Sequence, residues 1–252
     1  MASPGKTKLT APNLVLEALP LTREAFASFG DVIENPRPNV HPSSMSSSAS
    51  PGSAAVTLPF DAISANQGSA IKYQHVTRPI NLYSKAPSGR PGVAVTNMFV
   101  CASRGEDALP IPILERHPYT TQTFVPLQSN NRDKGNGYGY LVLVAPTLPN
   151  PHTKDGSGGL PDLGGLRAFV ASADGQAVTY GAGTWHAPMV ALGSPGTAVD
   201  FVVVQFANGV AEEDCQEVYL ESPEQGGGRG VVVKVGRDRL PGKVGASKLS
   251  KL

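Results

Sequence analysis

Cysteine is scarce in this chain of 252 residues. Cys101 and Cys215 are its only two, and they do not form a C-x-x-C pair. A disulfide scaffold is therefore not expected, which fits a reducing compartment. Neither cysteine has an adjacent histidine, and the serine-rich stretch 46–50 holds no nucleophile elbow. Covalent catalysis is therefore not indicated.

Long apolar runs and an excess of charge are also missing. No run approaches the length of about 18 residues that a membrane-spanning helix needs, and residues 1–12 lack the apolar segment of a secretory signal. We therefore expect no membrane insertion. Lys plus Arg number 21 against 20 Asp plus Glu, a net charge of +1. This balance gives no electrostatic reason to expect nucleic acid as a partner.

Nucleotide-binding signatures are absent as well. The chain has neither a phosphate loop nor a dinucleotide fingerprint. We therefore expect no nucleotide or organic cofactor.

Glycine (28 residues) and proline (23 residues) are abundant. Together they are 51 of the 252 residues, well above their usual combined share of about 12%. They punctuate short runs rich in Val, Phe, Tyr and Thr, which predict strands. Many short strands with few helices indicate an all-β barrel or sandwich. The run 201–206 is nearly all apolar, as expected of a strand buried on both faces. The strands are predicted at 93–101, 123–127, 138–145, 166–171, 176–180 and 199–206.

The remaining segments are predicted as a helix, insertions and a tail. A short helix begins at its cap Thr22 and ends at Gly30. The serine- and proline-rich stretch 36–59 predicts a disordered surface insertion. The polar, glycine-rich stretches 128–137 and 146–165 predict long loops at strand ends. We expect one domain over residues 1–220 and a flexible tail over 221–252.

Two half-motifs place polar groups in distant strand regions. The first is Glu115-x-His117-x4-Gln122, and the second runs from Gly175 to His186. They match the two cupin signatures H-x-H-x4-E and G-x5-P-x-G-x2-H, with Glu115 in place of the first His, Gln122 in place of the Glu, and glycine in place of the Pro. Their convergence inside one barrel would form a site.

Local spacing supports that convergence. Side chains two apart in a strand share a face, so Glu115 and His117 point the same way. The odd offset to Gln122 requires a bend, which Pro118 could supply. His186 follows a glycine-rich turn. Together Glu115, His117, Gln122 and His186 offer a mixed N/O ligand set for a divalent cation, although Gln is a weak ligand and Glu115 could instead form a structural ion pair.

Other polar or aromatic residues have simpler interpretations. We expect His41, His75 and His152 to be structural residues held by hydrogen bonds. Trp185, the only tryptophan, is by default a core residue, but beside His186 it could also wall the pocket. Lys72 and Arg104 are by default surface charges, but an acidic substrate needs such a residue to hold its carboxylate.

With these residues in place, the chain resembles the ureidoglycolate lyases, which split ureidoglycolate into glyoxylate and urea in allantoin catabolism. The resemblance spans residues 16–220. It rests on F-A-S-F-G-D-V-I-E at 26–34, E-R-H-P at 115–118, T-Q-T-F-V-P at 121–126, P-D-L at 161–163, R-A-F at 167–169, W-H at 185–186 and V-D-F at 199–201.

The resemblance implies a cupin-type barrel (a double-stranded β-helix, or jelly roll), commonly a homodimer, associated with a divalent metal such as nickel. It places Glu115, His117, Gln122 and His186 in the pocket, and Lys72 and Arg104, in looser alignment, near the substrate. In the reaction a base removes the proton of the 2-hydroxyl and the C–N bond breaks as urea leaves. His117 or Glu115 could be that base and His186 the acid.

Two other functions stay open. A different metal-dependent cupin, such as an oxygenase or isomerase, would usually keep a more histidine-rich ligand set. A binding cupin without catalysis would keep the pocket and lose the acid and base.

The last three residues, Ser250-Lys251-Leu252, match the peroxisomal import signal. They predict a peroxisomal location through the import receptor, with the cytoplasm as the alternative. The tripeptide could also be a chance match on a frayed tail.

Overall fold

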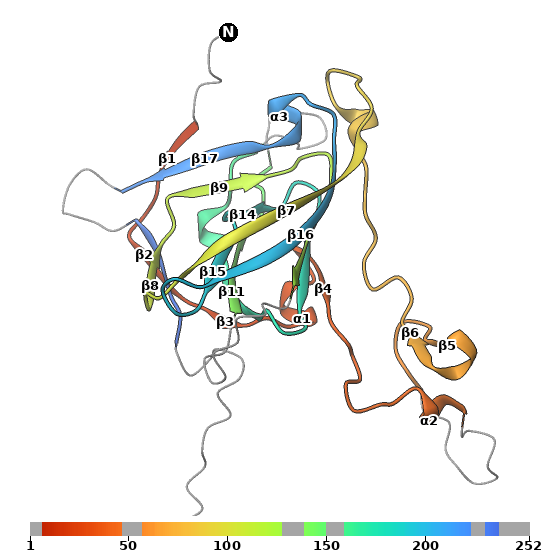
Figure 1. The fold of residues 1–252 in the computed structure, drawn as a ribbon. Coiled ribbons are helices and arrows are strands. Elements are labelled where there is room, and N and C mark those ends of the chain that lie inside the picture. Colours follow the sequence, from red (N-terminus) through yellow and green to blue (C-terminus); the bar gives the residue numbers. More distant parts are fainter. Residues whose placement is uncertain (1–6, 47–56, 128–138, 150–158, 223–229, 237–252) are drawn as a thin grey trace, which may run out of the picture.

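The computed structural model describes residues 7–46, 57–127, 139–149, 159–222 and 230–236. Its main element is a 13-stranded sheet that wraps around itself into a barrel (Figure 1). The strand order is β1-β17-β9-β14-β11-β15-β7-β16-β10-β13-β4, with β12 and β3 branching from β11. The all-β prediction is confirmed. Among the described residues, no helix is both long and apolar enough to cross a membrane.

The strands of the main sheet are β1 (Thr7–Thr10), β3 (Leu19–Pro20), β4 (Gly30–Ile33), β7 (Val93–Arg104), β9 (Ile113–Arg116), β10 (Gln122–Leu127), β11 (Gly139–Ala145), β12 (Arg167–Ser172), β13 (Ala177–Tyr180), β14 (Trp185–His186), β15 (Val190–Leu192), β16 (Ala198–Ala207) and β17 (Gln216–Glu221). A second sheet holds β2 (Leu14–Glu17), β18 (Val231–Lys234) and β8 (Ala108–Pro110), and a third pairs β5 (Ile63–Ala65) with β6 (Ala70–Lys72). The helical turns are α1 (Arg23–Phe26), α2 (Ser43–Ser46), η2 (Asn66–Gly68), η3 (Tyr83–Lys85), η4 (Leu163–Gly165) and α3 (Ala211–Asp214).

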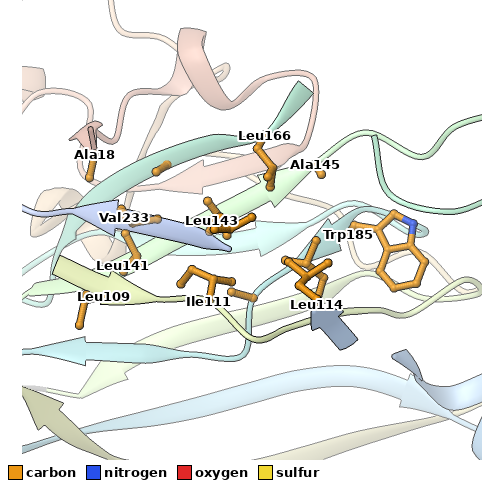
Figure 2. Packing of buried hydrophobic residues seen from close by; sticks show 14 of the residues in the cluster. Ala18, Leu109, Ile111, Leu114, Leu141, Leu143, Ala145, Leu166, Trp185 and Val233 are labelled. Atoms are coloured by element: carbon orange, nitrogen blue, oxygen red, sulfur yellow. The ribbon is translucent and has the colours of Figure 1, made fainter. Parts of the chain in front are cut away.

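The hydrophobic interior consists of two cores, and β11 contributes side chains to both. Successive side chains of a strand point to opposite faces of the sheet. Leu141, Leu143 and Ala145 face an outer core, which lies between the barrel wall and the sheet β2-β18-β8 (Figure 2). Tyr140 and Val142 face an inner core within the barrel. Every residue of β11 is therefore buried.

The tail prediction is wrong for residues 230–236. Strand β18 pairs with β2 in parallel and with β8 in antiparallel orientation, and Val231 and Val233 are buried in the outer core. The glycine-rich flanks obscured this short valine run in the sequence. Residues 223–229 and 237–252, including the terminal tripeptide, lie outside the described residues.

The apolar run of β16 is not buried on both faces in the single chain. Phe201 and Val203 point into the inner core, whereas Val202 and Val204 are only partly buried. The outward face continues on neighbouring strands, where Met98, Val100, Val125 and Leu127 are exposed. The sequence expectation of burial on both faces is therefore wrong for the chain by itself.

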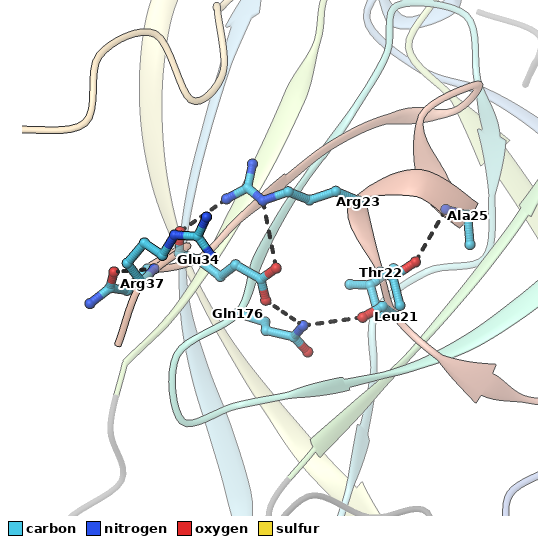
Figure 3. Close-up of polar contacts among 8 residues, drawn as sticks. Leu21, Thr22, Arg23, Ala25, Glu34, Arg37 and Gln176 are labelled. Atoms are coloured by element: carbon cyan, nitrogen blue, oxygen red, sulfur yellow. Dashed lines mark hydrogen bonds and ion pairs between the residues drawn. The ribbon is translucent and has the colours of Figure 1, made fainter. Parts of the chain in front are cut away.

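The predicted N-terminal helix is present but ends earlier than Gly30. Thr22 Oγ1 accepts the backbone N–H of Ala25 at 3.2 Å, as a helix cap does (Figure 3). Helix α1 ends at Phe26. Gly30 instead begins β4, where φ is +151° and an added Cβ would lie 1.9 Å from the Thr179 carbonyl oxygen. Only glycine permits this close approach of β4 to β13.

Polar contacts fasten α1 to the barrel. Arg23 Nη2 donates to the backbone carbonyl of Glu34 at 2.9 Å, and Gln176 Nε2 donates to the Glu34 carboxylate at 2.7 Å (Figure 3). The predicted insertion at 36–59 is described only in part, and its helical turn α2 ends where residues 47–56, which lie outside the described residues, begin.

Candidate active site

Four predicted site residues come together from β9 and the turn after it, from β14 beside β9, and from β10, which is not a neighbour of either strand in the sheet. Glu115 on β9 is the cross-strand partner of His186 on β14. His117 follows β9 directly, and Gln122 is the first residue of β10. The chain leaves β9 after Arg116 and enters β10 at Gln122. Because His117 and Gln122 are not on one continuous strand, their odd spacing does not force their side chains to opposite faces.

The reactive atoms are close enough to act on one small group. One ligand atom from each of Glu115, His117 and His186 lies within 4.8 Å of the others. The Nε2 atom of His186 lies 3.1 Å from Gln122 Oε1 and 3.4 Å from Glu115 Oε1. The centroids of the two imidazoles are 5.6 Å apart.

His117 is held by the backbone and leaves one nitrogen free. Its Nδ1–H donates to the Asp214 carbonyl oxygen at 2.6 Å, which fixes the ring orientation and places the lone pair on Nε2. That Nε2 is buried and has no hydrogen-bond partner among the described residues. Burial, together with the nearby His186, lowers the pKa of His117, so the ring is neutral at pH 7.

His186 is oriented in the same way. Its Nδ1–H donates to the Thr184 carbonyl oxygen at 3.0 Å, since a carbonyl can only accept. Its ring stacks on Tyr180 at a centroid distance of 4.0 Å and an interplanar angle of 10°. Nε2 then faces the oxygens of Gln122 and Glu115. A cation held between Nε2 and these oxygens satisfies this geometry.

Glu115 is ionised in this environment. Burial alone would raise the pKa of its carboxyl, but the hydrogen bond to His186, together with the neighbouring imidazoles, outweighs burial and lowers the pKa. The site therefore combines an ionised carboxylate with a neutral imidazole at pH 7.

Gln205 is a site residue that the sequence reasoning missed. Gln122 Nε2 donates to Gln205 Oε1 at 2.7 Å, which turns Gln122 Oε1 toward His186. The two glutamines are cross-strand partners on β10 and β16. A lone polar residue in the apolar run 201–206 was the available signal, because a buried polar group needs a partner.

The donor set fits a divalent cation. Two imidazole Nε2 atoms, a carboxylate and an amide oxygen are typical ligands of first-row metals. Ligands about 2.0–2.2 Å from one cation lie about 3.0–3.5 Å from each other, and the separations of 3.1 and 3.4 Å at His186 fall in that range. The unpartnered Nε2 of His117 and the carbonyl-bound Nδ1–H of each histidine are further features of metal sites.

A second group shares Glu115 but is a poorer ligand set. Atoms of Glu115, Cys215 and Glu217 also lie within 4.8 Å of one another. Burial, followed by the nearby carboxylates, raises the pKa of Cys215 to about 12, so its thiol keeps its proton. The histidine group is therefore the better candidate.

Trp185 lies on the opposite side of the barrel wall from His186. Its ring packs in the outer core (Figure 2). The buried guanidinium of Arg116 lies 4.7 Å from the ring centroid. A cavity of about 600 Å³ borders this pair, but Glu115, His117, Gln122 and His186 do not line it. The expectation that Trp185 walls the same pocket is therefore wrong, because neighbouring strand residues face opposite ways.

The two proposed carboxylate clamps are not brought to the site. Gln205 is the cross-strand partner of Val95, while Arg104 lies nine residues further along β7, about 30 Å away along an extended strand. Arg104 instead pairs with Glu106 at 3.5 Å. Lys72 is exposed on β6, in the hairpin that Figure 1 shows away from the barrel. Within one chain, neither residue can hold a substrate bound at His117.

Comparisons with known proteins agree on one family. The model of the family described as ureidoglycolate lyase matches residues 13–225. A ureidoglycolate lyase from Schizosaccharomyces pombe is 37% identical over 209 residues, which cover 81% of this chain and 90% of that protein. One from Saccharomyces cerevisiae is 38% identical over 162 residues, covering 61% and 75%. One from Pseudomonas aeruginosa is 30% identical over 210 residues, covering 83% and 93%.

Among solved structures, a dTDP-4-dehydrorhamnose 3,5-epimerase from Bacillus anthracis is 13% identical and covers 61% of this chain and 72% of that chain, with a TM-score of 0.28. That likeness is too slight to argue from.

Proposed function

Because this chain belongs to the ureidoglycolate lyase family, we propose that it splits ureidoglycolate into glyoxylate and urea. The convergence of Glu115, His117, Gln122 and His186 carries the proposal, since it supplies ionisable groups and ligand atoms to one small space. The reaction removes the proton of the 2-hydroxyl, forms the aldehyde C=O of glyoxylate, breaks the C–N bond and adds a proton to the departing urea nitrogen.

We further propose that these four residues hold a divalent cation, nickel being one candidate. The two Nε2 atoms would be its nitrogen ligands, and Glu115 and Gln122 would supply oxygens. Such a cation acts as a Lewis acid toward the hydroxyl and carboxylate oxygens of a substrate.

The protein itself prepares the site. Backbone carbonyls fix both imidazoles, Gln205 orients Gln122, and Tyr180 stacks against His186. This preorganisation lowers the cost of orienting the groups during reaction. The alternative mechanism, without a cation, uses His117 as the base and His186 as the acid, and His186 Nε2 lies 3.4 Å from the Glu115 carboxylate.

Incubation of the purified protein with racemic ureidoglycolate tests the proposed activity. We expect release of glyoxylate and urea in equal amounts, with half of the racemate consumed if one enantiomer is used. Binding of ureidoglycolate without glyoxylate release would instead favour a non-catalytic binding protein. If the protein neither bound nor converted ureidoglycolate, a different metal-dependent cupin would be favoured.

We propose that the exposed apolar face of β7 and β10 packs against a second copy of the chain. Met98, Val100, Val125 and Leu127 form part of this face and would be costly to leave in water. Light scattering after gel filtration measures the oligomeric state, and a monomeric mass would contradict the proposal.

We also propose a peroxisomal location, which Ser250-Lys251-Leu252 supports. A fluorescent protein fused in front of the last six residues should enter peroxisomes. Deleting only the final three exposes the preceding Ser-Lys-Leu at 247–249, so import should continue, whereas deleting all six should stop it. Diffuse cytosolic fluorescence with the intact tail would show that the tripeptide is a coincidence.

A further inference from the structure

We propose that Tyr83 and the carboxylate of Asp214 are positioning residues for His117. Neither belongs to the cluster of Glu115, His117, Gln122 and His186, and neither stood out in the sequence. The inference rests on the proposed function only for its kinetic readout, because the geometry of His117 can be measured independently.

The link to His117 is a single backbone carbonyl. The Asp214 carbonyl oxygen accepts the Nδ1–H of His117 at 2.6 Å. As long as this bond holds, the proton stays on Nδ1 and the lone pair stays on Nε2, which faces the site. A displaced carbonyl would release the ring and allow the other tautomer, whose Nε2 could neither bind a cation nor accept a proton.

The carbonyl belongs to an element that needs external support. Asp214 is the last residue of α3, a helix of only one turn, and isolated turns of this length are not stable. Its carboxylate accepts three hydrogen bonds: from the Tyr83 hydroxyl at 2.7 Å and from the backbone N–H groups of Asn208 and Gly209, each at 2.8 Å. The two N–H bonds are local, whereas Tyr83 connects the turn to a segment 131 residues away in the sequence.

The Tyr83 hydroxyl is aimed at Asp214 by packing of its ring. The side chain is fully buried and lies 5.8 Å, between ring centroids, from Tyr119, two residues beyond His117. Gly92 leaves room for it, since a Cβ there would come within 2.2 Å of the Tyr83 ring. Packing places the ring whether or not it carries a hydroxyl, so phenylalanine should fill the same space.

A neighbouring pair offers a matched control. Glu213, also in α3, accepts hydrogen bonds from the backbone N–H and the hydroxyl of Ser88, both at 2.7 Å. Ser88→Ala therefore removes a hydroxyl bond to a carboxylate of the same turn, as Tyr83→Phe does. Each hydroxyl also has weaker contacts that its variant loses: Ser88 accepts from the backbone N–H of Arg90 and from the Asn208 amide, and Tyr83 lies 3.2 Å from the Phe206 carbonyl oxygen. Ser88→Ala leaves Asp214 untouched. If the turn needs only general anchoring, the two variants should behave alike.

Kinetics give the first readout. We expect Tyr83→Phe to lower kcat about 10–100-fold with little change in KM, the usual scale for a group that orients a ligand or base. Ser88→Ala should stay within about twofold. Asp214→Asn should lower kcat at least as much as Tyr83→Phe, because it also takes an acceptor oxygen from the backbone N–H groups of Asn208 and Gly209. The double variant should lose less than the two single effects combined, because both changes weaken the bond between Tyr83 and Asp214.

The tautomer of His117 gives the second readout. Long-range ¹H–¹⁵N spectra of the full-length chain, which has only five histidines, report which ring nitrogen carries the proton. The parent and Ser88→Ala proteins should show His117 protonated at Nδ1, and Tyr83→Phe should show a mixture. An unchanged tautomer in Tyr83→Phe, or equal effects of Tyr83→Phe and Ser88→Ala, would overturn the proposal. Absence of lyase activity in the parent protein would refute the proposed function but leave this spectroscopic comparison valid.

Discussion

Replacing His117 or His186 with alanine should lower kcat at least about a hundredfold, the usual scale for removing a positioned acid or base. The reason is geometric, because each Nε2 points into the shared space and each Nδ1 is committed to a backbone carbonyl. Steady-state kinetics of glyoxylate release measure the effect, which should fall mainly on kcat and kcat/KM.

His41→Ala is the control for this experiment. His41 is exposed and contacts Ser43, the first residue of α2, so its loss should leave kcat unchanged. Because alanine at 186 also removes the stacking on Tyr180, a His186→Gln variant should accompany it, and circular dichroism should show that all variants fold. Near-normal turnover in a folded His117→Ala or His186→Ala protein would remove that residue from the mechanism.

Chelation of divalent metal should abolish the activity, and added Ni²⁺ should restore it. Calorimetric titration of the metal-free protein should show one cation per chain. Glu115→Gln should weaken its affinity at least about a hundredfold, since even partners that only orient a ligand are worth about 10–100-fold. The loss follows from replacing an ionised carboxylate with a neutral amide between two imidazoles.

Glu217→Gln separates the two candidate groups that share Glu115. Glu217 is the cross-strand partner of Glu115, but its carboxylate accepts the Tyr219 hydroxyl and belongs to the poorer group with Cys215. Its replacement should change metal affinity by no more than about twofold. Full activity after exhaustive chelation would instead support the mechanism in which His117 and His186 exchange protons without a cation.

The sequence by itself determined the fold class and the four polar residues that meet. Short runs rich in Val, Phe, Tyr and Thr, bounded by turn residues, predicted β7, β10, β11, β12, β13 and β16, because strand composition is local information. The spacing of Glu115 and His117 placed both on one face, and the glycine turn before His186 predicted a strand start there.

Local sequence patterns did not predict how the short strands pair. Strand β18 is four residues long between glycine-rich stretches, and its burial depends on β2 and β8, which are distant in the chain. Trp185 and His186 are adjacent in sequence, yet the barrel wall separates their side chains. Which face of a strand points inward depends on its partners.

Tertiary structure alone decided which groups support the site and which do not. Arg104 was a reasonable clamp until the register of β7 and β16 placed it nine residues from the level of Gln205. Conversely, Tyr83 and Asp214 carry no motif, because their relation to His117 passes through a backbone carbonyl that any residue could supply. A sequence pattern records side-chain identity, whereas a carbonyl's position depends on how the whole chain packs.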